Sequence, residues 1–441
     1  MVEIKKRPRL SEIAESINKE AGEMVAQFGL GELAEAKRVP FTSPRLNYET
    51  YGGIPMGTVV QFVGRESSGK TTTALDAVKN FQKEFEREFD EEIEKYETLI
   101  ASKKASKEDK EKYDRLLERG KRKVCYLNYE NTMDKVWALR LGVDDSEDAI
   151  FYRTPTEDLT AEKAFDEAIK IAETGEVGLI VLDSIVSLLS EQVIGESVGK
   201  AKVCGNAALV TRFLRKLIPI CRALNITVII INQVIANIKN PYADFEMPGG
   251  QGLRHYSDVI LVFKKGEFID DTGELKGKNA ESPSGNIVQV HVQKTKVFKP
   301  DRRIGFYSLT YDYGVDLVLD VFDLAVEFNA IEKSGGWYTL LNPKTKEPII
   351  GNDGKPLKFQ GKGNVIQYLR LYPSIANVFV NYVNELIEQS AVQIKVRETA
   401  EGDVIIRNEQ EQTEEQAEEK QVEETVDTTE EKPVKGKGKK K

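Results

Sequence analysis

The sequence predicts an α/β protein built around a mostly parallel sheet, because strand and helix signals alternate from residue 41 to about residue 325. Several strand candidates are nearly continuous runs of Val, Ile and Leu, as expected when both faces of a sheet are covered. Between the first run and an amphipathic stretch at 72–81 stands the pattern Gly-x-x-x-x-Gly-Lys-Thr, residues 64–71. The strand candidates are residues 59–63, 124–128, 179–183, 227–232, 259–263 and 287–293.

Two further segments add helices to this core. Residues 1–40 predict a helical arm that packs on its own core or on a neighbouring subunit, because apolar side chains recur in it at helical spacing. Residues 84–122 are unusually rich in charge and predict an inserted helical hairpin with a break at 102–106. The charged surface of this hairpin is either a solvated face or a partner-binding face. The apolar residues of the arm are Leu10, Ile13, Ile17 and Met24.

Two segments of different composition follow the core, which ends at about residue 325. Residues 326–397 predict a small C-terminal α+β domain, with a turn-rich section followed by a helical stretch over 365–390. Residues 398–441 lack apolar periodicity and predict a disordered tail. Glu dominates this tail from residue 409 to residue 431, and Lys dominates it from residue 432 onward.

The 441-residue chain has a net charge of −9, two histidines and three cysteines without metal-ligand spacing. This composition gives little support to a zinc site or a catalytic triad, and the cysteines fit a reducing, cytoplasmic setting. No apolar run approaches the roughly 20 residues of a membrane span, and residues 1–10 show no signal peptide, so we expect no membrane partner. The acidic average does not exclude a nucleic-acid partner, because local patches decide polyanion binding.

Each residue type in the 64–71 pattern has a role in binding nucleotide phosphates. Gly64 and Gly69 let backbone N–H groups turn toward phosphate oxygens, and the N-terminus of the following helix adds positive charge. Lys70 is expected to reach the β- and γ-phosphates, and the hydroxyl of Thr71 is expected to ligate Mg²⁺. The nucleotide-contacting residues expected here are Gly64, Arg65, Glu66, Ser67, Ser68, Gly69, Lys70, Thr71 and Thr72.

Three other strands place polar groups at the sheet edge where α/β proteins bind ligands. Asp183 ends an apolar strand and can hold Mg²⁺ through water beside Thr71. Glu130 follows another strand; it can orient and deprotonate an attacking water, or it is an ordinary acid at a helix entry. Gln233 ends a third strand and can hydrogen-bond a γ-phosphate, which would report hydrolysis to the long segment 234–250.

Eight motifs, in this order, resemble the bacterial RecA recombinases and their phage UvsX-type relatives over roughly residues 45–395. The resemblance implies a RecA-like P-loop ATPase core that binds ATP and Mg²⁺ and is a DNA-dependent ATPase. It implies a helical filament on single-stranded DNA that promotes pairing and strand exchange with homologous double-stranded DNA, in recombination, repair and recombination-dependent replication. It also implies loader and single-strand-binding proteins as partners, in a cytoplasm that is the host's if the protein is phage-encoded. The motifs are Gly-Gly-Ile-Pro-Met-Gly (52–57), the 64–71 loop, Leu-Gly-Val-Asp (141–144), Val-Leu-Asp-Ser (181–184), Ile-Asn-Gln (231–233), Gly-Gly (249–250), Lys-Thr-Lys (294–296) and Gly-Trp-Tyr (336–338).

The resemblance gives roles to residues around the nucleotide. Glu130 matches the glutamate that activates water, and Gln233 matches the glutamine that couples the γ-phosphate to the second DNA-binding loop. Trp137 stands where the family stacks an aromatic ring on adenine, and Asp134 stands where it has an acid near the base. The chain departs from the family at Asn128, where bacterial relatives often carry Asp, and in its charged hairpin.

The resemblance also assigns residues to DNA and to the subunit interface. Lys294 and Lys296 match a lysine pair that reaches a neighbour's ATP and would stabilise transition-state charge there. The stretches 190–205 and 234–250 match the two DNA-binding loops, and backbone contacts there predict strongly salt-dependent binding. The residues expected at DNA are Lys200, Lys202, Arg215, Gly249 and Gly250.

Two alternative functions stay open from the sequence. The first is another RecA-core DNA motor, such as a hexameric helicase or remodeller, which would usually carry an arginine finger instead of the Lys294 and Lys296 pair. The second is a DNA-binding module that is gated by nucleotide without significant turnover. Glu130 and Gln233 argue against the module, because assembly alone needs neither residue.

Overall fold

The computed structural model describes residues 10–21, 37–131, 133–191, 205–234, 247–277, 279–390, 394–398 and 404–408. The chain divides into two compact units, Met1–Lys37 and Arg38–Lys441. The first unit contributes helix α1 (Leu10–Ala21), which confirms a helix in this part of the predicted arm. The apolar side chains of Leu10, Ile13 and Ile17 are 67%, 40% and 43% exposed, so α1 presents an apolar stripe. Met24 lies outside the described residues.

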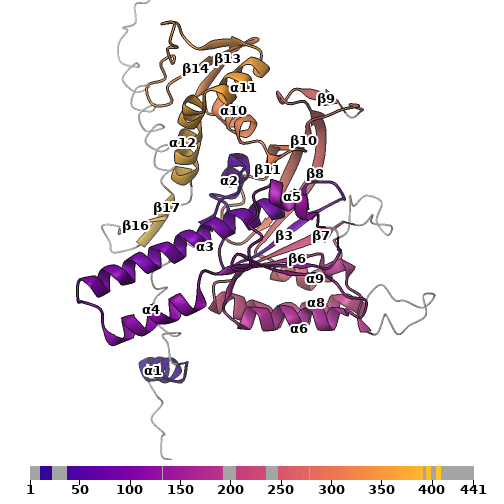
Figure 1. Cartoon of the computed structure of the whole chain (residues 1–441), viewed down its shortest axis with the longest axis vertical. Helices are drawn as coiled ribbons and strands as arrows, with labels where there is room; N and C mark the ends of the chain where they lie inside the picture. Colours follow the sequence, from indigo (N-terminus) through magenta and orange to yellow (C-terminus); the bar gives the residue numbers. More distant parts are fainter. Residues whose placement is uncertain are drawn as a thin grey trace, which may run out of the picture. The chain divides into compact units, whose positions relative to one another are not determined.

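A ten-stranded sheet organises the described part of the second unit (Figure 1). Its order is β12-β11-β10-β8-β3-β7-β6-β4-β5, with β9 paired to β8. The run from β8 to β5 is parallel, and β10, β11 and β12 extend it with antiparallel pairing, so the predicted mostly parallel sheet and its six strands are confirmed. The strands are β3 (Val59–Gly64), β4 (Lys123–Asn128), β5 (Ile150–Arg153), β6 (Val177–Asp183), β7 (Thr227–Gln233), β8 (Val259–Ile269), β9 (Leu275–Gly277), β10 (Gly285–Thr295), β11 (Ile304–Thr310) and β12 (Gly314–Val315), beside a separate pair β1 (Arg38–Val39) and β2 (Ile54–Pro55).

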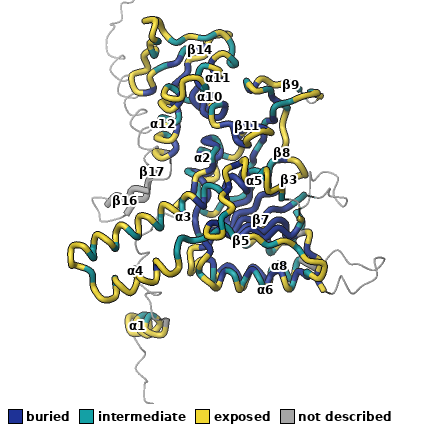
Figure 2. The backbone as a smooth tube through the Cα atoms, viewed as in Figure 1, coloured by how far each residue is buried: buried dark blue, intermediate teal, exposed yellow. Residues whose placement is uncertain are grey.

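Helices cover both faces of the sheet, which is why its central strands are buried along their length (Figure 2). Helix α3 packs on one face through Leu75, Val78 and Phe81, and helices α6 and α8 pack on the other through residues such as Phe165 and Leu214. This two-sided burial explains the continuous apolar runs in the sequence. The helices of this part are α2 (Pro44–Glu49), α3 (Lys70–Ala101), α4 (Lys107–Arg119), α5 (Lys135–Arg140), α6 (Ala161–Glu173), the 3₁₀ turn η1 (Ile185–Ser187), α8 (Gly205–Ala223) and α9 (Gly250–Tyr256).

The charged hairpin is present, but its first arm is not a separate helix. Helix α3 begins in the phosphate loop and continues without interruption to Ala101, so the helix predicted at 72–81 and the first hairpin helix are one element. No Gly or Pro separates the two predicted segments, and helix formers fill the junction. Ser106 then caps α4 and shares a capping box with Asp109. Because the helix is continuous, the hairpin is an extension of the element that carries Lys70 and Thr71, the residues predicted to bind phosphate and Mg²⁺.

The C-terminal part of the second unit, where the sequence predicts a small domain, combines helices with a three-stranded antiparallel sheet. The sheet consists of β13 (Ile331–Ser334), β14 (Trp337–Leu340) and β15 (Lys358–Gln360). The helices are α10 (Leu317–Glu327), α11 (Lys362–Leu371) and α12 (Pro373–Ser390). The predicted boundary at residue 325 falls inside α10, whose apolar side chains belong to the core of this domain. The single helical stretch predicted at 365–390 is two helices, because Pro373 disfavours helical geometry at the residue before it.

The segment predicted to be disordered begins with regular structure. Strands β16 (Ile394–Glu398) and β17 (Val404–Asn408) pair in antiparallel fashion, which differs from the prediction at Glu398 and over Val404–Asn408. Residues 409–441, which hold the acidic and Lys-rich runs, lie outside the described residues. Among the helices that the structure describes, none is long and apolar enough to cross a membrane.

Candidate nucleotide-binding and DNA-binding site

The predicted phosphate loop joins β3 to α3 and has the backbone that its sequence requires. Ser67 and Gly69 have positive φ values of 56° and 93°, and Gly69 is the N-cap residue of α3. A Cβ atom on Gly64 would lie 2.5 Å from the carbonyl oxygen of Phe263 on neighbouring β8. Glycine is therefore required at residue 64 by the close approach of two strands, and at residue 69 by the backbone conformation.

Lys70 is held inside the loop by its own backbone. The residue is buried, with an exposed fraction of 6%. Its Nζ donates a hydrogen bond of 2.7 Å to the carbonyl oxygen of Arg65. Burial lowers the pKa of Lys70, and the nearby carboxylates of Glu130 and Asp183 oppose that shift. A cation enclosed in this way is a strong site for phosphate oxygens, since a bound anion would compensate for its lost hydration.

Asp183 stands at the end of β6 and is almost completely buried, with an exposed fraction of 1%. Burial raises the pKa of its carboxyl group to about 6, and Glu130 contributes in the same direction. A hydrogen bond of 2.6 Å from the hydroxyl of Tyr126 to Oδ2 of Asp183 and the nearby charge of Lys70 oppose this rise. The carboxylate therefore needs positive charge next to it to stay ionised at low pH.

Glu130 and Gln233 are 103 positions apart in the sequence and in direct contact in the structure. Nε2 of Gln233 donates to Oε1 of Glu130 at 3.1 Å and lies 3.4 Å from Oε2. The hydroxyl of Ser184, the residue after Asp183, also donates to Oε1 of Glu130. Neighbouring strands produce this contact, because β7 and β4 both flank β6 and their carboxyl ends meet at one edge.

The oxygen donors at this edge fit a magnesium ion. Hard cations prefer oxygen ligands, and Mg²⁺ in nucleotide sites is usually held by one or two protein groups together with phosphates and water. Asp183 brings a carboxylate to this edge at the end of β6, and the hydroxyl of Thr71, in the first turn of α3, is the second oxygen that the sequence predicts. Within the described part of the chain, no group of three or more His, Cys, Asp or Glu side chains could hold a metal ion by itself. The set therefore suits a cation that arrives with a nucleotide.

Trp137 and Asp134 lie at the start of α5, next to the phosphate loop. Indole Nε1 of Trp137 is 3.4 Å from Oγ1 of Thr72, which places the ring beside the first turn of α3. Oδ1 of Asp134 accepts hydrogen bonds from the backbone N–H groups of Val136 and Trp137 and so caps α5. In the structure Asp134 thus orients the helix that carries Trp137. Their predicted contacts with a base stay predictions.

Comparison with known proteins identifies the family. The model of the RecA N-terminal domain matches residues 117–316. Protein RecA of Borrelia duttonii is 29% identical over 343 residues, which cover 78% of this chain and 78% of that protein. Protein RecA of Francisella tularensis subsp. novicida is 30% identical over 294 residues, which cover 66% of this chain and 68% of that protein. This chain belongs to the RecA family.

A solved structure, that of the RadB recombinase, is also similar, at 19% sequence identity and a TM-score of 0.40. It covers 62% of this RecA-family chain and 95% of the RadB chain. Protein RecA of Ruminococcus albus is 27% identical over 353 residues, covering 80% of this chain and 73% of that protein. The phage origin considered from the sequence stays a prediction.

In this RecA-family chain Lys294 and Lys296, which are predicted to act on a neighbouring subunit, hydrogen-bond to backbone carbonyl oxygens of their own chain. Nζ of Lys294 donates to the backbone carbonyl oxygens of Arg254, His255 and Ser257, at 2.6, 3.1 and 2.8 Å. Nζ of Lys296 donates to the carbonyl oxygen of His255 at 2.9 Å and lies 3.4 Å from a carboxylate oxygen of Asp258. These contacts place two cations at the C-terminal end of α9, where the helix dipole favours positive charge.

The predicted DNA-binding residues divide into two groups. Lys200 and Lys202 lie outside the described residues, as do residues 235–246 of the second loop. Arg215 is exposed on α8, and its Nε donates to the hydroxyl of Tyr256 at 3.0 Å. Gly249 and Gly250 lead into α9 with positive φ values of 95° and 77°. The described residues therefore place the end of the second loop at the start of the helix that Lys294 and Lys296 contact.

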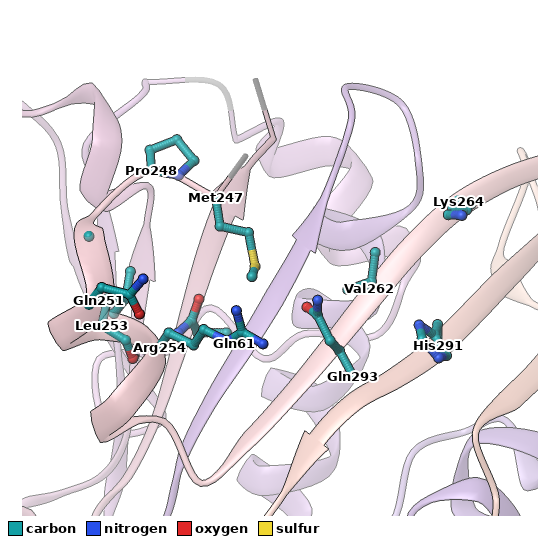
Figure 3. A pocket seen from close by; sticks show the side chains of 11 residues that line it. Gln61, Met247, Pro248, Gln251, Leu253, Arg254, Val262, Lys264, His291 and Gln293 are labelled. Atoms are coloured by element: carbon teal, nitrogen blue, oxygen red, sulfur yellow. Dashed lines mark hydrogen bonds between the residues drawn. The ribbon is translucent and has the colours of Figure 1, made fainter. Parts of the chain in front are cut away.

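A cavity of about 580 Å³ opens beside this helix, lined from β3, α9, β8 and β10 (Figure 3). Three of its residues, Arg254, Lys264 and His291, carry basic groups. Burial lowers the pKa of His291, and the charges of Arg303 and Lys264 act in the same direction, which indicates a positive local potential. The lining residues are Gln61, Met247, Pro248, Gly250, Gln251, Leu253, Arg254, Val262, Lys264, His291 and Gln293.

Sequence reasoning missed several residues that the structure adds to the site. Ser184 directly follows Asp183, and its hydroxyl could have been suspected from that position alone. Lys264 directly follows the apolar run 259–263 within the same strand, and this change from apolar to charged residues could have been noticed in the sequence. Tyr126 gave no signal, because a tyrosine within an apolar strand is ordinary core composition.

Proposed function

We propose that this chain is an ATP-dependent recombinase that forms a helical filament on single-stranded DNA. In this role it pairs the bound strand with homologous double-stranded DNA and promotes strand exchange, in recombination, repair and recombination-dependent replication. Membership of the RecA family supports the proposal. The observation that carries it is the contact between Gln233 and Glu130, because it links the strand that leads into the second loop to the carboxylate suited to activate water.

The proposed reaction is hydrolysis of ATP to ADP and phosphate. Lys70 and the backbone N–H groups of the loop bind the β- and γ-phosphates, and Thr71 and Asp183 hold Mg²⁺. Bound Mg²⁺ supplies positive charge against the phosphate oxygens. Glu130 orients the attacking water and accepts its proton as the bond from the water oxygen to the γ-phosphorus forms and the bond to the β–γ bridging oxygen breaks, which releases ADP. Gln233 bonds to the same carboxylate, so a shift of Gln233 from Glu130 toward a bound γ-phosphate would couple hydrolysis to the position of the second loop.

The same proposal assigns the filament contacts to exposed apolar and basic groups. The apolar stripe of α1 packs on a neighbouring subunit, since burying it there removes apolar area from water. Lys294 and Lys296 leave the carbonyl oxygens of α9 and reach a neighbour's phosphates when subunits assemble. This arrangement makes each site complete only within the filament.

DNA contacts are proposed along α8 and α9. Arg215 and the cavity residues Arg254 and Lys264 provide positive charge beside Gly249 and Gly250, and His291 adds a hydrogen-bonding imidazole to the same cavity. Such groups would bind phosphates without reading sequence, which suits a protein that must accept any strand. Loader and single-strand-binding proteins remain proposed partners.

Three assays on one preparation test the proposal. ATP turnover is measured with and without single-stranded DNA, filaments are imaged by electron microscopy, and strand exchange is followed with homologous and heterologous duplexes. We expect DNA-stimulated turnover, filaments, and exchange only with the homologous duplex. Unwinding of a forked duplex without exchange would favour the helicase-type motor, and filaments without turnover would favour the nucleotide-gated module. Lys70→Ala is the negative control for all three assays.

A further inference from the structure

Each of the two carboxylates in the site is hydrogen-bonded by one hydroxyl group. Ser184 donates to Glu130, and Tyr126 donates to Asp183. Tyr126 is fully buried in β4, so its hydroxyl is shielded from water and bonds to Oδ2 of Asp183 at 2.6 Å. A hydroxyl that donates to a carboxylate in such a setting forms a charge-assisted bond, which is stronger and more directional than a neutral one.

Strand register creates the contact between Tyr126 and Asp183. In the parallel pair of β4 and β6, Tyr126 lies opposite Val181 and Asn128 lies opposite Asp183. Side chains alternate along a strand, so Tyr126 and Val181 project toward the face covered by α3, as does Asp183 two residues after Val181. The long tyrosine side chain spans this two-residue step.

We propose that Tyr126 is a positioning residue that orients the Asp183 carboxylate for Mg²⁺. With Oδ2 fixed by a donor, the carboxylate is held in one orientation, and its other oxygen stays available to a metal-bound water. Without the hydroxyl, the carboxylate can rotate or turn toward the ammonium group of Lys70, whose charge already acts on it. The inference rests on the proposed function, because it concerns the magnesium-nucleotide site.

The test measures metal binding instead of turnover. Tyr126→Phe removes the hydroxyl and keeps the ring in the core. In the full-length protein, binding of a fluorescent non-hydrolysable ATP analogue is titrated with Mn²⁺ as a stand-in for Mg²⁺. We expect the Mn²⁺ midpoint to rise about ten- to hundredfold, the range of a hydrogen bond to a charged group. Analogue binding in EDTA should stay unchanged, because the phosphate loop is intact.

Tyr129→Phe is the matched control. Tyr129 is also buried in this region, but its hydroxyl donates at 3.2 Å to the backbone carbonyl oxygen of Ala164, and its ring belongs to the core on the opposite face of the sheet. The control loses a buried tyrosine hydrogen bond whose hydroxyl does not bond to the Asp183 carboxylate, so its Mn²⁺ midpoint should match that of the wild type. Equal shifts in both variants would show general loosening of the core and would overturn the inference.

A second variant keeps the test decisive if Tyr126→Phe does not fold. Incorporation of 4-fluorophenylalanine at residue 126 fills most of the hydroxyl volume but supplies no donor, so the same rise in midpoint is expected. A midpoint within twofold of the wild type in a folded variant lacking the donor overturns the role of Tyr126 while leaving the proposed function standing. Absence of metal-dependent nucleotide binding in the wild type would instead refute both.

Discussion

Two regions of the core differ in how their charged side chains are held. The first, which we call the hydrolytic edge, is the sheet edge with Asp183, Glu130 and Gln233, and the second, the α9 side, holds Lys294 and Lys296. At the hydrolytic edge, Asp183 is buried and both its carboxylate and that of Glu130 receive hydrogen bonds from side chains on adjacent strands. On the α9 side, Lys294 and Lys296 are near solvent and donate mainly to backbone carbonyl oxygens at a helix end.

The buried Asp183 carboxylate keeps its hydrogen-bond donor, whereas the lysine ammonium groups near solvent can exchange one acceptor for another. A buried carboxylate cannot lose its donor without a large free-energy cost, so its position is set when the sheet forms. An ammonium group near solvent can exchange carbonyl oxygens for phosphate oxygens at little net cost, since both are acceptors. The first region therefore suits bond breaking, and the second suits assembly on a partner.

Loss of the buried cation gives the largest expected effect. Lys70→Ala should abolish ATP binding, because the phosphates lose their main positive partner in an enclosed site. Lys83→Ala, which removes an exposed lysine from the same helix, should bind ATP like the wild type. Equilibrium binding of a labelled nucleotide distinguishes them. Near-normal hydrolysis in Lys70→Ala would exclude the 64–71 loop as the phosphate site.

Glu130→Gln tests whether the carboxylate at the hydrolytic edge acts as the base. The amide keeps the shape of the carboxylate but cannot accept the proton from water, so turnover should fall about 10²- to 10⁴-fold while ATP and DNA binding persist. Steady-state turnover and nucleotide binding are measured on the same preparation. A fall of less than threefold would require another residue as the base.

The lysine pair tests whether the α9 side acts on a neighbour. Lys294→Ala combined with Lys296→Ala should impair DNA-stimulated turnover and cooperative filament formation but leave nucleotide binding by the isolated subunit nearly intact. Mixing these subunits with Lys70→Ala subunits should restore some activity, because certain interfaces then combine two intact halves. No recovery at any ratio, in filaments confirmed to be mixed, argues against a site completed between subunits.

A smaller effect is expected from the cavity. Lys264 lines it, whereas the next residue, Lys265, points to the other face of β8 and lies 4.6 Å from the ring centroid of Phe268. Lys264→Ala should weaken DNA binding severalfold at low salt and reduce the salt dependence by about one phosphate contact. Lys265→Ala changes the net charge equally and should have little effect. Equal losses would mean that overall charge, and not the cavity, determines binding.

Removal of the charged tail should have the smallest effect. Truncation after Asn408 deletes the acidic run together with the terminal lysines and should strengthen binding to double-stranded DNA, most clearly at low salt where screening is weak. Truncation after Glu431 deletes only the Lys-rich end and should weaken non-specific binding. Identical salt titrations for both truncations and the full chain would rule out an electrostatic role for the tail.

Much of the fold was predictable because its signals are local. The six apolar runs became strands, since a buried parallel strand needs continuous apolar residues whatever its neighbours are. The extent of α3 was not predictable, because propensity favours helix throughout the junction at residues 82–85 and only the absence of a breaker distinguishes one helix from two. The strands β16 and β17 were missed because their alternation is short and lies next to a highly polar tail.

The sequence by itself determined the phosphate loop, the strand ends that carry Asp183, Glu130 and Gln233, and the chemistry available there. The loop is specified by residues that adjoin one another, so eight positions suffice to define it. Only the tertiary structure decided that Gln233 donates to Glu130, that Tyr126 reaches Asp183, and that the lysine pair rests on α9. These contacts depend on strand order and register, which arise from packing between distant segments of the chain.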